Sequence, residues 1–178
     1  MGFTNETIEL TGPSINELSL QAISPKYRTI NITLNLLLTA IAMLVLSILP
    51  LDVITQTEDW DWMQNNSVWL YIAIGALGSL FVIYHFFADP IIQYAVREHD
   101  VHFQTGLFFR KFISQPILRV QHIELKRGPI ERKFGLATLQ VFSAGGISHT
   151  FEIPGLEYEK AVSLRQFIIN HSDLSIDE

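Results

Sequence analysis

Two long uncharged runs constrain this chain more than any other feature of its sequence. No Asp, Glu, Lys or Arg occurs from Thr29 to Leu51, and none occurs from Trp62 to Ala88. About 20 apolar helical residues, each rising about 1.5 Å, cross a hydrocarbon core of about 30 Å. Both runs are long enough, so we predict two transmembrane helices.

Alternative explanations of the runs fit less well. A soluble helical hairpin would have to bury uncharged residues on every face of both helices. A cleaved signal peptide would begin with a short basic region, but here Glu6, Glu9 and Glu17 precede the first run. Small residues, Gly75 with Ser79 and Ala40 with Ser47, allow close helix approach, either within the chain or to another membrane subunit.

The charges that flank the runs predict an orientation. Lys26 and Arg28 precede the first run, Arg97 is the first basic residue after the second, and the connector 52–67 has four acidic residues and no Lys or Arg. By the positive-inside rule both termini are cytoplasmic and the protein is multi-pass. The chain then divides into a cytoplasmic N-terminal segment (1–27), a transmembrane hairpin (28–88) with an acidic external connector (52–67), a cytoplasmic domain (89–172) and a tail (173–178).

Beyond Pro90 the pattern changes to short β-type runs separated by turn residues. A helical spacing of apolar residues follows in 157–171. We therefore predict an α-helical membrane hairpin followed by an α+β domain, in which an antiparallel β-barrel or sheet is capped by a C-terminal helix. The six expected strands are 91–96, 101–104, 107–113, 119–126, 137–142 and 148–153, with Gly106, Gly128-Pro129, Gly145-Gly146 and Pro154-Gly155 as turns.

An ordered series of short motifs carries a family resemblance across residues 25–170. They are Pro25-Lys-Tyr-Arg28, Arg97-Glu-His-Asp100, Gly106-Leu107 with Arg110, Pro116 with Arg119-Val-Gln-His122, Gly128-Pro129 with Arg132 and Phe134-Gly-Leu-Ala137, Ala144-Gly-Gly146 and Ile153-Pro-Gly-Leu156. In these the chain resembles the bacterial pleckstrin-homology-like (PH-like) membrane proteins of the YdbS type. The resemblance implies a two-span inner-membrane hairpin that carries a cytoplasmic PH-like domain, often encoded beside a larger relative with several such domains. It implies no known reaction.

The best candidate site is a basic turn around Gly128-Pro129. Lys126, Arg127, Arg132 and Lys133 are opposed only by Glu131, which leaves a charge of +3 in eight residues. One interpretation is a solvated turn that follows the positive-inside bias. The other is contact with membrane lipids through anionic headgroups, or with another membrane protein, for which the larger multi-PH-domain relative is a candidate.

The remaining chemistry favours a binding or scaffolding module within a membrane complex over an enzyme. No nucleophile elbow or phosphate-binding loop occurs, so no catalytic residue and no cofactor is predicted. His99, His102, His122 and His149 lack metal-ligand spacing, and the absence of cysteine excludes thiolate sites. The net charge of −6 disfavours nucleic acid. The alternative is a lipid-directed enzyme or transport accessory subunit with its site at the membrane-facing rim of the domain.

Overall fold

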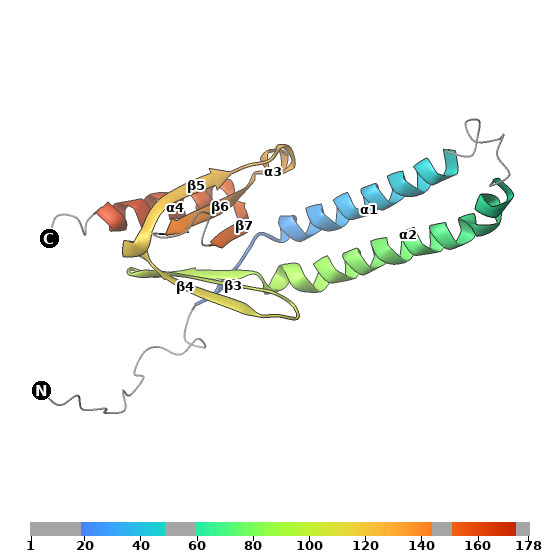
Figure 1. Ribbon diagram of the computed structural model, residues 1–178. Coiled ribbons are helices and arrows are strands. Elements are labelled where there is room, and N and C mark those ends of the chain that lie inside the picture. Colours follow the sequence, from blue (N-terminus) through green and yellow to red (C-terminus); the bar gives the residue numbers. More distant parts are fainter. Residues whose placement is uncertain (1–18, 49–59, 144–150, 174–178) are drawn as a thin grey trace, which may run out of the picture.

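The computed structural model describes residues 19–48, 60–143 and 151–173, and shows a helical hairpin that projects from one end of a β-rich domain (Figure 1). In chain order the elements are β1 (Gln21–Ala22), α1 (Pro25–Ile48), α2 (Trp60–Ala88), η3 (Asp89–Ile91), β2 (Gln93–Val96), β3 (Asp100–Thr105), β4 (Lys111–Pro116), η4 (Ile117–Arg119), β5 (Val120–Lys126), α3 (Pro129–Phe134), β6 (Leu136–Ser143), β7 (Phe151–Glu157) and α4 (Tyr158–Asp173).

The two uncharged runs form the paired helices α1 and α2. The stretches Pro25–Ile48 and Val68–Ile91 are long and apolar enough to cross a membrane. Gly78 is buried against α1, where a Cβ would lie 2.5 Å from the Thr39 Oγ1. Gly78 is not one of the predicted small residues. Of the predicted pair on α2, Gly75 also packs on α1, since a Cβ there would lie 3.2 Å from Met43 Cε. Ser79 stays exposed and donates its hydroxyl hydrogen to the Gly75 carbonyl at 2.8 Å.

The domain consists of two antiparallel sheets, one in the order β1-β2-β3-β4 and the other β5-β6-β7. Phe103 of the first sheet stacks on Phe151 of the second, with ring centroids 5.7 Å apart, inside a shared apolar core. The predicted antiparallel sheet and C-terminal helix are confirmed, and Ala161 and Ile168 of α4 are fully buried. The alternative of a closed barrel is wrong for the described residues: η4 turns the chain between β4 and β5, so these strands do not pair.

Several strand and turn predictions need correction. Residues 107–110 are not strand, because Gly106, with φ of +99°, ends β3 and the chain then turns back into β4. Gly128-Pro129 is not a simple turn but the start of α3. Pro154-Gly155 lies inside β7, where the register with β6 shifts between Ala137 and Leu139. The predicted Gly145-Gly146 turn and residues 148–150 lie outside the described residues.

The N-terminal segment contributes a strand that the sequence does not predict. Gln21 and Ala22 pair with Tyr94 and Gln93 of β2, and Ile23 joins the core. A strand this short has no periodicity to read. The domain's first sheet therefore includes residues on both sides of the helical hairpin in the sequence.

Strand direction determines which turns lie near the hairpin. The chain leaves α2 through β2, and each later strand runs antiparallel to the one with which it pairs. The β3–β4 turn (residues 106–110) and α3 therefore lie at the hairpin end of the domain, and η4 lies at the opposite end (Figure 1). Only the hairpin end can contact the membrane that the helices would span.

A glycine allows the hairpin to dock on the domain. The Ser24 amide donates to the Gly155 carbonyl at 3.0 Å, just before α1 begins. Gly155 has φ of +66°, and a Cβ there would lie 2.6 Å from the Cβ and Cγ of Tyr27. A larger residue would push the first turn of α1 away from β7.

Gly155→Ala should therefore destabilise the protein more than the matched variant Gly135→Ala. Gly135 has a similar φ of +71° but open space where a Cβ would lie. Its replacement should cost only the left-handed strain, about 1–2 kcal/mol. The clash with Tyr27 should add about 1–3 kcal/mol to the loss for Gly155→Ala. Thermal unfolding of the full chain in mild detergent measures both variants, and equal losses would contradict the docking role.

Candidate functional site

The basic turn is built on α3, a six-residue helix fixed at both ends. The Gly128 amide donates to Glu131 Oε2 at 2.7 Å, and the Thr138 hydroxyl donates to Glu131 Oε1 at 2.8 Å. Gly135 ends the helix in the left-handed conformation. Thr138 is buried, and its hydroxyl is satisfied by this contact with Glu131.

The four predicted basic residues do not act as one group. Arg127 is half-buried: its guanidinium carbon lies 3.9 Å from the ring centroid of Tyr158, and its Nε donates to the Leu136 carbonyl at 3.1 Å. Its role is to hold the turn onto the start of α4. Lys126, Arg132 and Lys133 are the exposed members.

No ion pair between described residues involves Lys126, Arg132 or Lys133. Glu131, which the sequence offers as their counter-charge, is instead engaged by the Gly128 amide and Thr138 hydroxyl. The turn therefore presents its positive charge to whatever lies at the hairpin end of the domain.

Apolar side chains of α3 share a groove with α1. Ile130 and Phe134, one helical turn apart, are 40% and 47% exposed. The groove is about 520 Å³ in volume. Its walls are Thr29, Ile30, Thr33, Leu34 and Leu37 of α1, and Pro129, Ile130, Lys133 and Phe134 of α3. A basic and apolar surface of this kind suits the boundary between lipid headgroups and acyl chains.

A buried carboxylate fixes the position of α1 and α2 where they join the domain. Asp89 is 4% exposed, accepts a hydrogen bond from Asn31 Nδ2 at 3.0 Å, and lies 3.1 Å from His85 Nδ1. Nearby, the Arg28 guanidinium carbon lies 5.2 Å from the ring centroid of Phe86. The polar residues at the domain ends of α1 and α2 therefore lie at the same height along the hairpin, beside the groove between α1 and α3.

Sequence reasoning did not identify Ile130, Phe134 or the Asp89 contacts as parts of this site. The signal for α3 was present, since Glu131 follows Gly128 by three residues and Pro129 stands at the first helical position. Nothing in the sequence indicates that Asp89 would contact Asn31, 58 residues away.

Two of the four histidines considered from the sequence, His102 and His122, each lie beside a carboxylate. A hydrogen bond from Arg97 holds the pKa of Asp100 below its ordinary value, and His102 Nε2 lies 2.9 Å from the Asp100 Oδ1. His122 lies on another strand, 3.1 Å from Glu124. Among the described residues, no three His, Cys, Asp or Glu side chains are placed to hold a metal ion. His149 lies outside the described residues.

Comparison with known proteins gives one family match and two relatives. Residues 30–171 match the family model described as "Bacterial PH domain". The chain is 27% identical over 146 residues to the UPF0699 transmembrane protein YdbS of Bacillus subtilis (strain 168), covering 80% of this chain and 86% of that protein. It is 26% identical over 105 residues to YdbT of the same strain, covering 56% of this chain and 21% of YdbT. No solved structure matches.

The division of the basic turn into one internal and three exposed residues can be tested by stability. Arg127→Ala removes the contact with Tyr158 and the hydrogen bond to Leu136, so we expect a loss of about 1–3 kcal/mol. The neighbouring Lys126→Ala should change stability by less than about 0.5 kcal/mol. Denaturant unfolding of both variants in the same detergent measures the difference. An Arg127→Ala protein as stable as Lys126→Ala would show that the arginine is not structural.

Proposed function

Because this chain belongs to the bacterial PH domain family, we propose that it is a membrane-anchored, non-enzymatic binding module whose α3 surface contacts anionic lipid headgroups. The observation that carries the proposal is the position of Lys126, Arg132 and Lys133, exposed and without ion-pair partners at the hairpin end of the domain. Each Lys or Arg near an anionic leaflet contributes about 1 kcal/mol. Three such residues are enough to orient a domain that is already tethered.

The proposed location is the bacterial inner membrane, with both termini and the PH-like domain on the cytoplasmic side. Two observations support it. Lys26 and Arg28 lie in the first turn of α1, at the domain end of the hairpin. The helix α3, which includes Arg132 and Lys133, lies at the same end (Figure 1). The connector 52–67, which has four acidic residues and no Lys or Arg, would then face outward.

Assembly with a second membrane protein is part of the same proposal. The exposed faces of α1 and α2 carry small residues such as Ser79 that permit close helix contact. The chain is similar to a segment that makes up only 21% of YdbT, which supports a larger relative with several such domains as the candidate partner. A scaffolding role follows if the α3 surface orients the domain while the helices contact the partner.

Reversing the exposed cations of α3 should reduce lipid contact without unfolding the protein. We expect Arg132→Glu with Lys133→Glu to lower photo-crosslinking to phosphatidylglycerol in nanodiscs by at least about 30-fold, since the loss of two cations alone removes about 2 kcal/mol. The matched control is Arg119→Glu with Arg165→Glu, two exposed residues on η4 and α4 that remove the same charge. Equal crosslinking by both folded double variants would refute headgroup contact at α3.

The orientation of the protein in the membrane can be tested separately. A reporter active only outside the cytoplasm should be active when inserted in the connector 52–67 and inactive when fused after Glu178. A reporter active only in the cytoplasm should show the reverse. If the connector proves cytoplasmic, the α3 surface faces away from the cytoplasmic leaflet and the proposed location is wrong.

A further inference from the structure

A second surface at the hairpin end of the domain is exposed, apolar and unused by the proposal above. The β3–β4 turn carries Phe108 and Phe109, which are 82% and 91% exposed and are the two most exposed large hydrophobic side chains among the described residues. Two adjacent phenylalanines in water expose much apolar area with no packing in return. In a soluble domain such a turn would favour aggregation. The residues that surround the turn therefore indicate what could cover it.

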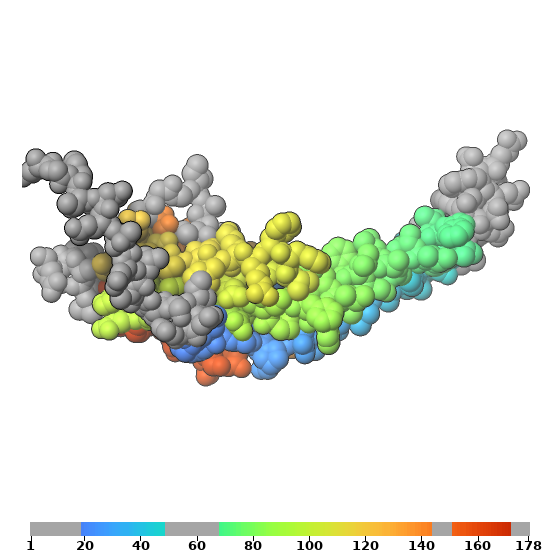
Figure 2. Space-filling view, turned by 90° about the horizontal axis from the view of Figure 1, so that it is seen from below, coloured from blue at the N-terminus to red at the C-terminus, as the bar shows by residue number. Residues whose placement is uncertain are grey.

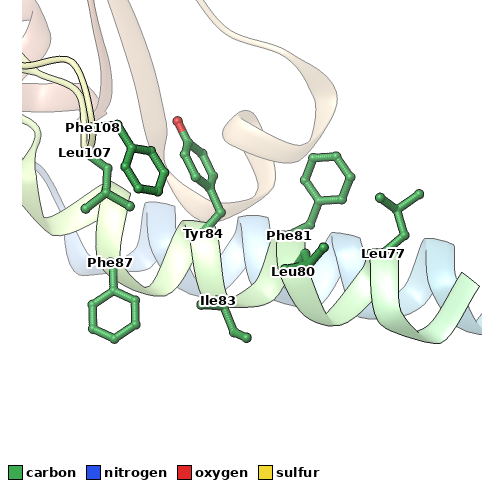
Figure 3. A pocket seen from close by; sticks show the side chains of 8 residues that line it. All are labelled: Leu77, Leu80, Phe81, Ile83, Tyr84, Phe87, Leu107 and Phe108. Atoms are coloured by element: carbon green, nitrogen blue, oxygen red, sulfur yellow. The ribbon is translucent and has the colours of Figure 1, made fainter. Parts of the chain in front are cut away.

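The turn lies against the side of α2. Leu107 and Phe108 share a groove of about 490 Å³ with six apolar or aromatic residues of that helix (Figure 3). Figure 2 shows this turn, in yellow, standing out beside the green helix α2. The six helix residues are Leu77, Leu80, Phe81, Ile83, Tyr84 and Phe87.

The groove extends along α2 over a length that matches the thickness of one lipid leaflet. From Leu77 to Phe87 the helix rises about 15 Å, which is half of a hydrocarbon core of about 30 Å. Phe87 lies next to Ala88 and Asp89, where the polar contacts with Asn31 and His85 mark the end of the apolar span. The turn therefore lies at the level of the leaflet that faces the domain.

The basic residues next to the turn also fit a position at the membrane surface. Arg110 and Lys111 follow Phe109 directly, and both are exposed. No ion pair between described residues involves either of them. Aromatic side chains followed directly by basic residues are typical of segments that lie at a lipid interface, where the rings contact the acyl chains and the cations contact the headgroups.

We propose that Leu107, Phe108 and Phe109 insert into the leaflet that faces the domain, and that acyl chains of its phospholipids fill the groove between this turn and α2. The inference rests on the proposed function in one respect, that α1 and α2 span a bilayer with the domain at its surface. It adds a second membrane contact, beside α2, to the contact that α3 makes beside α1. The domain is then held at the membrane by the hairpin and by a turn on each side of it.

The absence of cysteine makes a direct test possible, because a single introduced cysteine carries the only spin label. The full chain is labelled at Phe109→Cys, at Leu80→Cys in the groove wall, or at Leu118→Cys, a 66% exposed apolar residue at the opposite end of the domain. Each sample is placed in phosphatidylglycerol and phosphatidylcholine nanodiscs, and its accessibility to oxygen and to a water-soluble nickel chelate is measured.

We expect the Phe109→Cys label to be reached by the chelate about tenfold less than the Leu118→Cys label, because burial of one Phe favours the inserted state by at least about tenfold. It should stay accessible to oxygen, as the Leu80→Cys label should. If the chelate reaches the Phe109→Cys label as readily as the Leu118→Cys label while the Leu80→Cys label is protected, insertion is refuted and the span stands. If the chelate reaches the Leu80→Cys label too, the span itself fails, and the proposed function with it.

Two further measurements distinguish lipid from other occupants of the groove, and exclude effects of replacing Phe109 with a labelled cysteine. Dipolar broadening between Phe109→Cys labels, with low oxygen accessibility, would show a second copy in the groove and overturn the lipid assignment. A conservative variant, Phe109→Trp with Trp60, Trp62 and Trp69 replaced by Phe, keeps the turn aromatic. Its fluorescence should be quenched by brominated acyl chains, and quenching by aqueous iodide alone would also overturn the proposal.

Discussion

The arrangement of this protein depends on one buried carboxylate at the place where its helices meet its sheets. Asp89 follows α2 immediately, yet it contacts Asn31 of α1 and His85 of α2. A carboxylate that is 4% exposed must be paired, because leaving it without partners in a desolvated site costs several kcal/mol. A shift of one helix along the other would break at least one of these contacts. The axial register of the hairpin is thereby tied to the first residues of the domain.

Once that register is set, the alternating direction of the strands determines what faces the membrane. The β3–β4 turn and α3 are among the segments that lie at its hairpin end (Figure 1). These turns lie beside different helices, one against α2 and the other against α1. Each combines exposed apolar side chains with adjacent exposed cations, Arg110 and Lys111 in one and Arg132 and Lys133 in the other.

The sequence predicts the parts of this structure that repeat over many residues and misses those that depend on distant contacts. The two spans, the antiparallel strands and α4 follow from uncharged runs or periodicity. By contrast, α3 is too short for a periodic signal, and β1 has only two residues. The inward position of Arg127 depends on Tyr158, 31 positions along the chain. Four neighbouring basic residues look equivalent in sequence because nothing local distinguishes the one that packs inward.

The misplaced third strand shows why an apolar run is ambiguous in a membrane protein. Leu107, Phe108 and Phe109 have the composition of a buried strand, and composition alone cannot tell burial in protein from burial in lipid. In a free soluble domain the insertion of these three side chains would be too weak to hold a protein on a membrane. In the proposed arrangement the helices keep the turn beside the leaflet, so its insertion is an intramolecular step at high effective concentration. Small, separate contacts at α3 and at the β3–β4 turn can then set the orientation of the whole domain.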